Sequence, residues 1–297
     1  MSDRTFADDI PAPRRAASGT VAVLRRLLSE PLGVLGLSLV LLVVFGAIFA
    51  DQLTPYDPIK MVVRDRFEPP TLDHWLGTDH LGRDLLSRVL HGGRIALGLS
   101  ISATAASLLL GGVLGLIAGY GPRWLDNAMV LLFDTVRSFP TVMITLALAI
   151  LLGRSLWTVF VVVIAVFAPG YGRIVRTQTI ALRNAEFVLA TRAVGAGVAR
   201  VLAVHILPNI IGPVLIIACM DIPVVITIEA GISFLGLGVP PPAPSWGTIL
   251  NEGQNYIQDS PWPSIAGGLG LILATLGFTF FGETLRDVID PRLRRDG

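Results

Sequence analysis

The side chains of this sequence that could act on a solute are acids placed deep in an apolar stretch. Asp221 and Glu229 follow the Leu207-Pro208 pair in an otherwise uncharged segment. Along a helix that begins at Pro208, they stand roughly 20 Å and 32 Å from its start, at about 1.5 Å per residue. In a helix that crosses a membrane, an acid usually faces the bundle interior or a water-filled cavity. Asp221 and Glu229 are therefore candidates for a translocation path or its outer gate; the alternatives are a structural pair with an arginine of another subunit or a hydrogen-bonded neutral acid.

A second group of polar side chains precedes a long uncharged stretch. Residues 76–88 read Leu-Gly-Thr-Asp-His-Leu-Gly-Arg-Asp-Leu-Leu-Ser-Arg. Thr78 or Asp79 can cap a helix N-terminus, and the spacing of the apolar residues predicts an amphipathic helix at the outer surface of a membrane. Its charged residues would be available for docking a partner protein; they are Asp79, Arg83, Asp84 and Arg88. Two histidines flank this helix without a third ligand at metal-site spacing, so we expect no metal ion.

The residues of an enzyme or a nucleotide site are not found in this sequence. A phosphate-binding P-loop needs the pattern G-x-x-x-x-G-K-[ST], in which backbone amides and the Lys hold the phosphates. The single Lys of the chain is Lys60, and neither Gly of the pattern precedes it. No Ser or His stands at a defensible spacing for a nucleophile and its base. The sequence therefore predicts no catalytic residue and no ATP site in this chain.

The composition indicates the environment of these residues. Of 297 residues, 53% are hydrophobic and 15% are charged, against roughly 45–50% and about 25% in soluble domains. The mean hydropathy of +0.69 points in the same direction. The single Cys excludes a disulfide framework, and a net charge of +1 gives no reason to expect nucleic-acid binding. These values are typical of a membrane protein and exclude an ordinary soluble enzyme.

Uncharged windows mark six expected membrane spans. A bilayer core about 30 Å thick needs roughly 20 apolar residues of helix. The windows that we assign to spans are 31–50, 95–122, 138–153, 155–172, 201–220 and 260–282. A seventh window, 230–251, is rich in Gly and Pro and cannot satisfy its backbone as a helix in lipid, so we expect an extracytoplasmic loop there. The expected fold is an all-α, polytopic membrane protein with six transmembrane helices.

Two further features of the spans can be predicted. Gly111, Gly115 and Gly119 share one face of the second span, which favours close packing on another helix. With the N-terminus in the cytoplasm, most of the 23 Lys and Arg residues, Arg137 among them, fall in cytoplasmic segments, as the positive-inside rule requires. This gives a cytoplasmic tail over 1–30, a transmembrane domain over 31–285 and a cytoplasmic tail over 286–297.

The stretch 173–205, between the fourth and fifth spans, carries too many charges to cross a membrane and is expected to form a cytoplasmic loop with a short helix. Asn184 can cap this helix, Glu186 suits the helix dipole in its first turn, and Gly195 and Gly197 end it. Four residues at helical spacing form a ridge; they are Phe187, Ala190, Thr191 and Val194. From the pattern alone, insertion of this ridge into a groove on a partner and a position on the lipid surface are equally well supported.

Residues 186–208 resemble the "EAA…G…LP" loop of ABC-importer permeases. Leu189, Ala190 and Thr191 stand at the E-A-A positions, Gly195 at the motif Gly, and Leu207-Pro208 at its end. Leu189 and Thr191 depart from the motif, and Glu186, one turn earlier, can supply the acid on a similar face. The resemblance implies a role in coupling to an ATPase for Glu186, Phe187, Ala190, Thr191, Val194, Gly195, Leu207 and Pro208.

Other segments resemble the C-type permease subunit of dipeptide and oligopeptide importers. They are residues 76–88, residues 233–238 with 241–247, and Arg286-Asp287 with Asp290-Pro291-Arg292. The match extends in order from about Pro31 to Arg292 with a compatible topology. The same subfamily includes permeases for nickel and other small solutes, so the resemblance identifies the family more closely than the solute.

The resemblance implies half of a permease in a bacterial plasma membrane. Such a subunit pairs with a homologous permease, two cytoplasmic ATPase subunits and an extracytoplasmic solute-binding protein. The ATPases bind ATP and Mg²⁺, and this chain is expected to bind no cofactor. ATP binding then moves the coupling helices and switches the access of the cavity. The alternatives are an ion-coupled secondary transporter that uses intramembrane acids as relays, although the two halves show no convincing repeat, and a membrane enzyme or scaffold.

Overall fold

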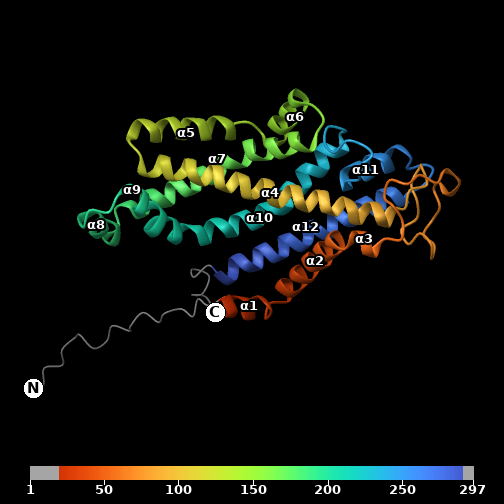
Figure 1. Ribbon diagram of the computed structural model, residues 1–297, viewed down its shortest axis with the longest axis horizontal. Helices are drawn as coiled ribbons and strands as arrows, with labels where there is room; N and C mark the ends of the chain where they lie inside the picture. Colours follow the sequence, from red (N-terminus) through yellow and green to blue (C-terminus); the bar gives the residue numbers. More distant parts are fainter. Residues whose placement is uncertain (1–19, 290–297) are drawn as a thin grey trace, which may run out of the picture.

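The computed structural model describes residues 20–289, and these residues form a bundle of helices without a β-strand (Figure 1). Its helices are α1 (Thr20–Leu27), α2 (Pro31–Ile48), α3 (Ala50–Leu53), η1 (Val63–Asp65), α4 (Leu85–Tyr120), α5 (Arg123–Arg137), α6 (Thr141–Leu152), α7 (Leu156–Arg183), α8 (Glu186–Ala193), α9 (Val198–Arg200), η2 (Val201–Ile206), α10 (Leu207–Phe234), α11 (Trp246–Asn255) and α12 (Trp262–Ile289). Most of the expected cytoplasmic tails, and Asp290-Pro291-Arg292, lie outside the described residues.

Five segments of the described chain are long and apolar enough to cross a membrane, and one bent pair of helices has the length and composition of a sixth. The unbroken segments are α2, α4, α7, α12 and Val198–Phe234, which includes α10. The bent pair consists of α5 and α6, whose axes are at 89° to each other. Pro140 lies at the bend; because Pro has no backbone N–H and restricts the residue before it, a helix is interrupted there. The prediction of an all-α membrane protein is confirmed, and the six predicted spans correspond to the five unbroken segments and the bent pair, so the third predicted span is not one straight helix.

Several helices extend beyond the windows from which they were predicted. α7 continues to Arg183 and therefore takes up the first part of the stretch 173–205 that was expected to be a loop. α10 continues to Phe234, so the Gly- and Pro-rich loop begins later than expected, and α11 follows it. The loop that was expected on the cytoplasmic side is consequently short and consists mainly of α8 and α9.

The glycine face of α4 packs on α7, as its spacing predicted. A Cβ atom added to Gly111 would lie 2.8 Å from the Cβ of Tyr171, and one added to Gly115 would lie 2.8 Å from the Cβ of Val175. One added to Gly119 would lie 2.6 Å from the Cβ of Thr179. The contacts advance along both helices in the same direction, so α4 and α7 are parallel. Only glycine permits this approach, because real Cβ atoms do not come so close.

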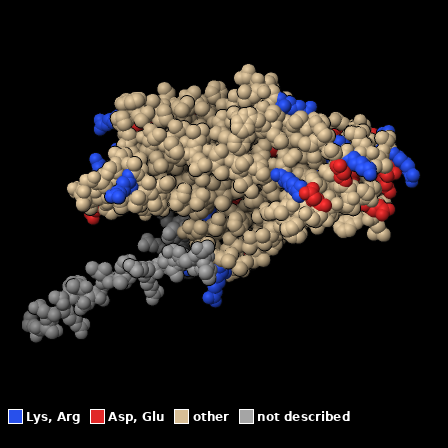
Figure 2. Space-filling model, viewed as in Figure 1, with Lys and Arg blue, Asp and Glu red and all other residues tan. Residues whose placement is uncertain are grey.

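The ends of the bundle differ from its middle. α1 and the last turns of α12 lie toward the end that carries α8 and α9, whereas α11 and the loop between α3 and α4 lie at the other end (Figure 1). Figure 2 shows charged side chains toward both ends and a broad, nearly uncharged band between them. Such a band is what a bilayer core requires of a spanning protein.

Candidate functional site

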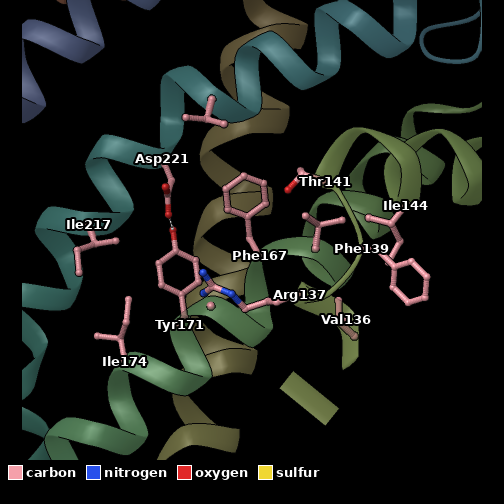
Figure 3. A pocket seen from close by; sticks show the side chains of 13 residues that line it. Val136, Arg137, Phe139, Thr141, Ile144, Phe167, Tyr171, Ile174, Ile217 and Asp221 are labelled. Carbon is pink, nitrogen blue, oxygen red and sulfur yellow. Dashed lines mark hydrogen bonds between the residues drawn. The ribbon is translucent and has the colours of Figure 1, made fainter. Parts of the chain in front are cut away.

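A cavity of about 370 Å³ opens where the bend between α5 and α6 faces α7 and α10 (Figure 3). Much of its wall is apolar and includes Phe139, Phe167, Ile174 and Ile217. Three lining side chains can form strong polar interactions with a solute; they are Arg137, Tyr171 and Asp221. A concave, mostly apolar site with a few convergent polar groups is the usual form of a small-molecule site.

Asp221 is held in this cavity by α7. The hydroxyl of Tyr171 donates a hydrogen bond of 2.6 Å to Oδ2 of Asp221. The Tyr171 side chain is buried, and Asp221 is partly exposed to the cavity. The position predicted for Asp221, inside the bundle rather than against lipid, agrees with this arrangement. Its role in a translocation path remains a prediction.

Arg137 is a member of the cavity that sequence reasoning missed. We counted it among the cytoplasmic cations, but α5 turns back along the bundle and carries Arg137 roughly 20 Å from Arg123, at about 1.5 Å per residue. The direction follows from the ion pairs between α5 and α7, in which Asp126 meets Arg176 and Asp134 meets Arg173. No acidic partner for Arg137 is found among residues 20–289. The signal in the sequence was Pro140, which ends α5 just after this arginine.

Glu229 does not line this cavity. Its side chain is fully buried near the C-terminal end of α10, where the Ser233 hydroxyl donates a hydrogen bond of 2.8 Å to Oε1. The same Ser233 oxygen accepts a hydrogen bond from the backbone of Val239. Glu229 Oε2 has no hydrogen-bond partner among the described residues. The carboxyl thus lies where α10 meets the following loop, and a role in the outer gate stays a prediction.

The amphipathic helix expected over Asp79–Arg88 is not present, and this expectation was wrong. α4 begins only at Leu85, and its N-cap is Asp84, whose Oδ2 accepts a 2.8 Å hydrogen bond from the Ser87 backbone. Before it the chain forms a tight turn in which Gly82 has a φ of +71°, a conformation that glycine adopts at least cost. Thr78, Asp79 and Asp84 are all good capping residues, so composition did not identify the one that is used.

The four charged residues proposed for docking are buried, and three of them, Asp79, Arg83 and Arg88, form a network of ion pairs, whereas Asp84 pairs with His74. Asp79 Oδ2 lies 2.6 Å from Arg83 Nε and 2.8 Å from Arg88 Nη1. Both arginines also reach Glu252 of α11, at 2.8 Å and 3.0 Å. The side chain of Arg88 is only 1% exposed. These residues therefore join the first loop to α11, and they can position a docking surface but do not form it.

The carboxylates of this network could also be considered for a metal ion. Asp79, His80 and Glu252 bring ligand atoms within 4.8 Å of one another. Two guanidinium groups already occupy the carboxylates, and the His80 ring stacks on Tyr256 at 4.6 Å. Positive charge next to the acids opposes the binding of a cation, so this geometry disfavours a metal site.

A second ion pair fixes α3 to the first half of α4. Arg94 Nη2 lies 2.8 Å from Asp51 Oδ2, and His91 Nε2 lies 3.0 Å from Oδ1. The hydrogen bond from Arg94, followed by that from His91, lowers the pKa of the Asp51 carboxyl below its ordinary value. Asp51 is therefore ionised at neutral pH, and its pairing connects α3 to α4.

The short helix predicted in the cytoplasmic loop is confirmed as α8, with one correction at its start. Its N-cap is Ala185, which offers no side-chain hydrogen bond, whereas Asn184 ends α7. Gly195 ends α8 with a φ of +88°. The backbone of Gly195 bonds to Arg192 and that of Ala196 to Thr191, which is the Schellman arrangement that a glycine favours at this position.

The predicted ridge of α8 is largely free to meet a partner. Phe187 and Val194 are 43% and 89% exposed, and Ala190 is exposed beside them. Thr191 is partly exposed, and its hydroxyl bonds to the backbone oxygen of Phe187. On the opposite side, Val188 is fully buried and anchors the helix. Exposed apolar side chains on a helix at an end of the bundle, outside the uncharged band, are typical of an interaction surface.

One apolar cluster runs from this helix to the cavity. It contains Val188 of α8, Val201 and Ile206 of η2, Ile210 and Val214 of α10, and Val175 and Tyr171 of α7. Tyr171 is also the hydrogen-bond donor to Asp221. α8 and the cavity are therefore connected through contiguous packed side chains, and Leu207-Pro208 lie between them at the start of α10.

Two family models match this sequence. Residues 111–295 match the inner membrane component of binding-protein-dependent transport systems. Residues 20–70 match the N-terminal transmembrane domain of oligopeptide transport permease C.

Curated relatives are similar over nearly the whole chain. One is the dipeptide transport system permease protein DppC of Alkalihalophilus pseudofirmus, 35% identical over 91% of this chain and 89% of its own length. A putative peptide transport system permease protein of Brucella abortus is 35% identical over the full length of both chains. A putative peptide permease protein of Brucella suis is 36% identical over 97% of this chain and 95% of its own.

Proposed function

The chain belongs to the family of inner-membrane components of binding-protein-dependent transport systems, and from this premise we propose that it forms half of the membrane path of an ATP-driven importer of di- or oligopeptides. The family expected from the loop and pre-span motifs is thereby confirmed, as is a multi-pass membrane permease. A permease of this kind is a transport component and not an enzyme. The solute, the partners and the roles of single residues are parts of the proposal.

The proposed assembly contains a homologous permease, two cytoplasmic ATPase subunits and an extracytoplasmic binding protein. The ATPases hold ATP and Mg²⁺, since this sequence has no P-loop. Both termini lie in the cytoplasm, in agreement with the distribution of Lys and Arg. α8 then lies on the cytoplasmic side, and the first loop and α11 lie on the side of the binding protein.

The observation that carries the proposal is the cavity between the α5–α6 bend, α7 and α10. It places Asp221 and Arg137 within the apolar part of the chain. Charged groups at this depth are costly unless they face water or a solute. One subunit supplies only part of the wall, and the homologous permease completes the path.

Coupling is assigned to α8. Its exposed ridge, Phe187, Ala190, Thr191 and Val194, enters a groove on an ATPase. Displacement of α8 moves Val188 and the packed cluster behind it, which includes Tyr171. Because packed cores have discrete arrangements and do not deform continuously, a small shift at α8 can change the shape of the cavity.

Docking of the binding protein is assigned to the outer surface that the ion-pair network supports. Asp79, Arg83 and Arg88 hold the first loop against α11 from within, and Asp84 pairs with His74 of the same loop. The exposed side chains of the first loop include Leu72 and Trp75, which are 95% and 69% exposed. Large exposed apolar residues at the water-facing end suit a protein contact.

The proposal is tested with the complex purified from membranes through a tag on this chain. The complex is reconstituted in proteoliposomes with its binding protein, and uptake of radiolabelled dialanine is measured with and without ATP. We expect uptake that requires ATP, the binding protein and the ATPase subunits. ATP-dependent uptake of Ni²⁺ but not of dialanine would reject the peptide assignment. Uptake driven by a pH gradient without ATP would show an ion-coupled transporter instead.

A further inference from the structure

We propose that the cavity recognises the two charged termini of an unblocked peptide, with Asp221 binding the terminal ammonium and Arg137 binding the terminal carboxylate. This inference rests on the proposed function, since it assumes that the cavity is the translocation path. It goes further by assigning the chemistry that selects the solute. Recognition then depends on the two ends of the peptide and hardly on its side chains.

The two charges share one cavity without forming an ion pair with each other. Asp221 lies beyond the hydroxyl end of Tyr171, whereas the Arg137 guanidinium lies beside the tyrosine ring (Figure 3). The two groups are thus separated along the length of the Tyr171 side chain. A carboxylate and a guanidinium held apart in this way match a zwitterionic peptide, whose terminal ammonium and carboxylate groups are separated by a short backbone.

Asp221 retains the capacity to bind a cation. Tyr171 donates to Oδ2, and an ionised carboxylate has about four acceptor positions on its two oxygens. The Tyr171 hydroxyl therefore fixes the orientation of the carboxylate without using up its acceptors. An ammonium group with three donors suits such a carboxylate.

Arg137 is available for an anion. The neighbouring arginines of α7 are occupied, because Arg173 pairs with Asp134 and Arg176 pairs with Asp126. Arg137 has no such partner in the part of the chain that the structure describes. A guanidinium group presents parallel N–H donors that fit a carboxylate at both oxygens.

Gly170 makes room for the Arg137 side chain. A Cβ atom at Gly170 would lie 3.2 Å from Nη1 of Arg137, closer than ordinary van der Waals contact. The guanidinium is therefore seated against the bare backbone of α7, inside the cavity. A methyl group at this position would displace the cation without removing its charge.

The apolar part of the cavity wall explains why we expect peptides with different side chains to be accepted. Phe139, Phe167, Ile174 and Ile217 offer apolar contact without directed hydrogen bonds. Apolar pockets discriminate weakly between solutes, whereas a site that hydrogen-bonds a polar group rejects an analogue that lacks it. A bare divalent cation such as Ni²⁺ would meet the positive charge of Arg137. The site therefore favours short peptides of varied sequence with both ends free.

The inference is tested by removing the charge from one terminus of the peptide and from one side chain of the cavity in the same set of experiments. Reconstituted complexes carry Asp221→Asn or Arg137→Gln, and transport is measured for dialanine, N-acetyl-dialanine and dialanine amide. Each peptide is supplied well above the Kd of the binding protein for it, so that differences between permease variants do not reflect loading. Matched controls are Glu283→Gln and Arg123→Gln, which remove the same charges outside the cavity.

We expect the unaltered complex to transport dialanine about tenfold faster than either blocked peptide, the factor that about 1.4 kcal/mol produces. Asp221→Asn removes only the discrimination against the acetylated peptide, and Arg137→Gln removes only that against the amide. Gly170→Ala, which keeps both charges, weakens discrimination against the amide. The control variants retain both preferences.

Other outcomes distinguish a failure of this inference from a failure of the proposed function, peptide import. If both cavity variants reduce transport of all three peptides by one common factor, or change nothing, the termini are not read here and the inference is overturned. The peptide assignment survives in that case because ATP-dependent uptake of dialanine remains. If the unaltered complex transports no peptide at all, the proposed function itself fails. Co-purification of the partner subunits with each variant shows that folding is intact.

Discussion

The hydroxyl of Tyr171 lies 2.6 Å from Oδ2 of Asp221, and this hydrogen bond joins α7 to α10 inside the bundle. Tyr171 belongs at the same time to the apolar cluster that reaches Val188 of α8. One side chain thus takes part both in the cavity and in the packing that leads to the predicted coupling helix. This double position makes Tyr171 an informative residue to change.

We expect Tyr171→Phe to leave the fold intact and to reduce ATP-driven peptide uptake by about tenfold or more. The substitution removes a hydrogen bond to a charged group, which contributes about 1.5–3 kcal/mol, while the ring still fills its place in the cluster. Uptake in proteoliposomes is the measurement. Tyr56→Phe, in the first loop, serves as the matched control. Equal losses in the two variants would show that the Tyr171 bond has no special part in transport.

Packing of α4 on α7 gives a prediction about stability. Gly115→Leu should destabilise the bundle by about 1–3 kcal/mol or more, because there is no space between the helices for extra side-chain atoms. Gly112 is the matched control: it lies in the same helix, but no atom lies within 4 Å of an added Cβ. Thermal unfolding in detergent should show a lower Tm for Gly115→Leu and little change for Gly112→Leu. A similar Tm for both would mean that α4 and α7 do not pack as described.

The ridge of α8 gives a prediction about coupling. Ala190→Glu should weaken co-purification of the ATPase subunits and lower ATP-driven uptake, because a charge would be buried in the expected groove. Leu189→Glu introduces the same charge at a neighbouring exposed position off the ridge and at the motif Glu position, so it should be tolerated. Retention of ATPases and of full transport by Ala190→Glu would remove α8 from the coupling mechanism.

What could be predicted from the sequence depended on local patterns. Uncharged windows identified the spans because hydropathy is a property of each segment by itself. The Gly111–Gly119 face and the glycine end of α8 were also visible, since both follow from spacing along one helix. The bend at Pro140 was missed because a search for uncharged windows does not register a residue that breaks a helix.

The parts that could not be predicted depend on contacts between distant segments. Arg83 and Arg88 meet Glu252, which follows them by more than half of the chain. A sequence pattern shows that these residues are charged, but not that their partners come from α11. Arg137 was assigned to the cytoplasmic surface for the same reason, because only the course of α5 beside α7 brings it into the cavity.

The buried network at the outer end gives the last prediction. Arg88→Met should destabilise the outer end strongly, since breaking a buried ion pair by removing one partner costs about 3–5 kcal/mol. Asp79 and Glu252 would lose a guanidinium that lies within 3.0 Å of each. Arg64→Met is the control, because the Arg64 side chain is 94% exposed and such surface pairs contribute little. We expect hydrogen exchange in 76–88 and in α11 to rise together in Arg88→Met only, with a loss of uptake that follows the loss of structure. Binding-protein-dependent uptake that falls in Arg88→Met while exchange stays unchanged would instead assign Arg88 a direct part in docking, as its position in the sequence first suggested.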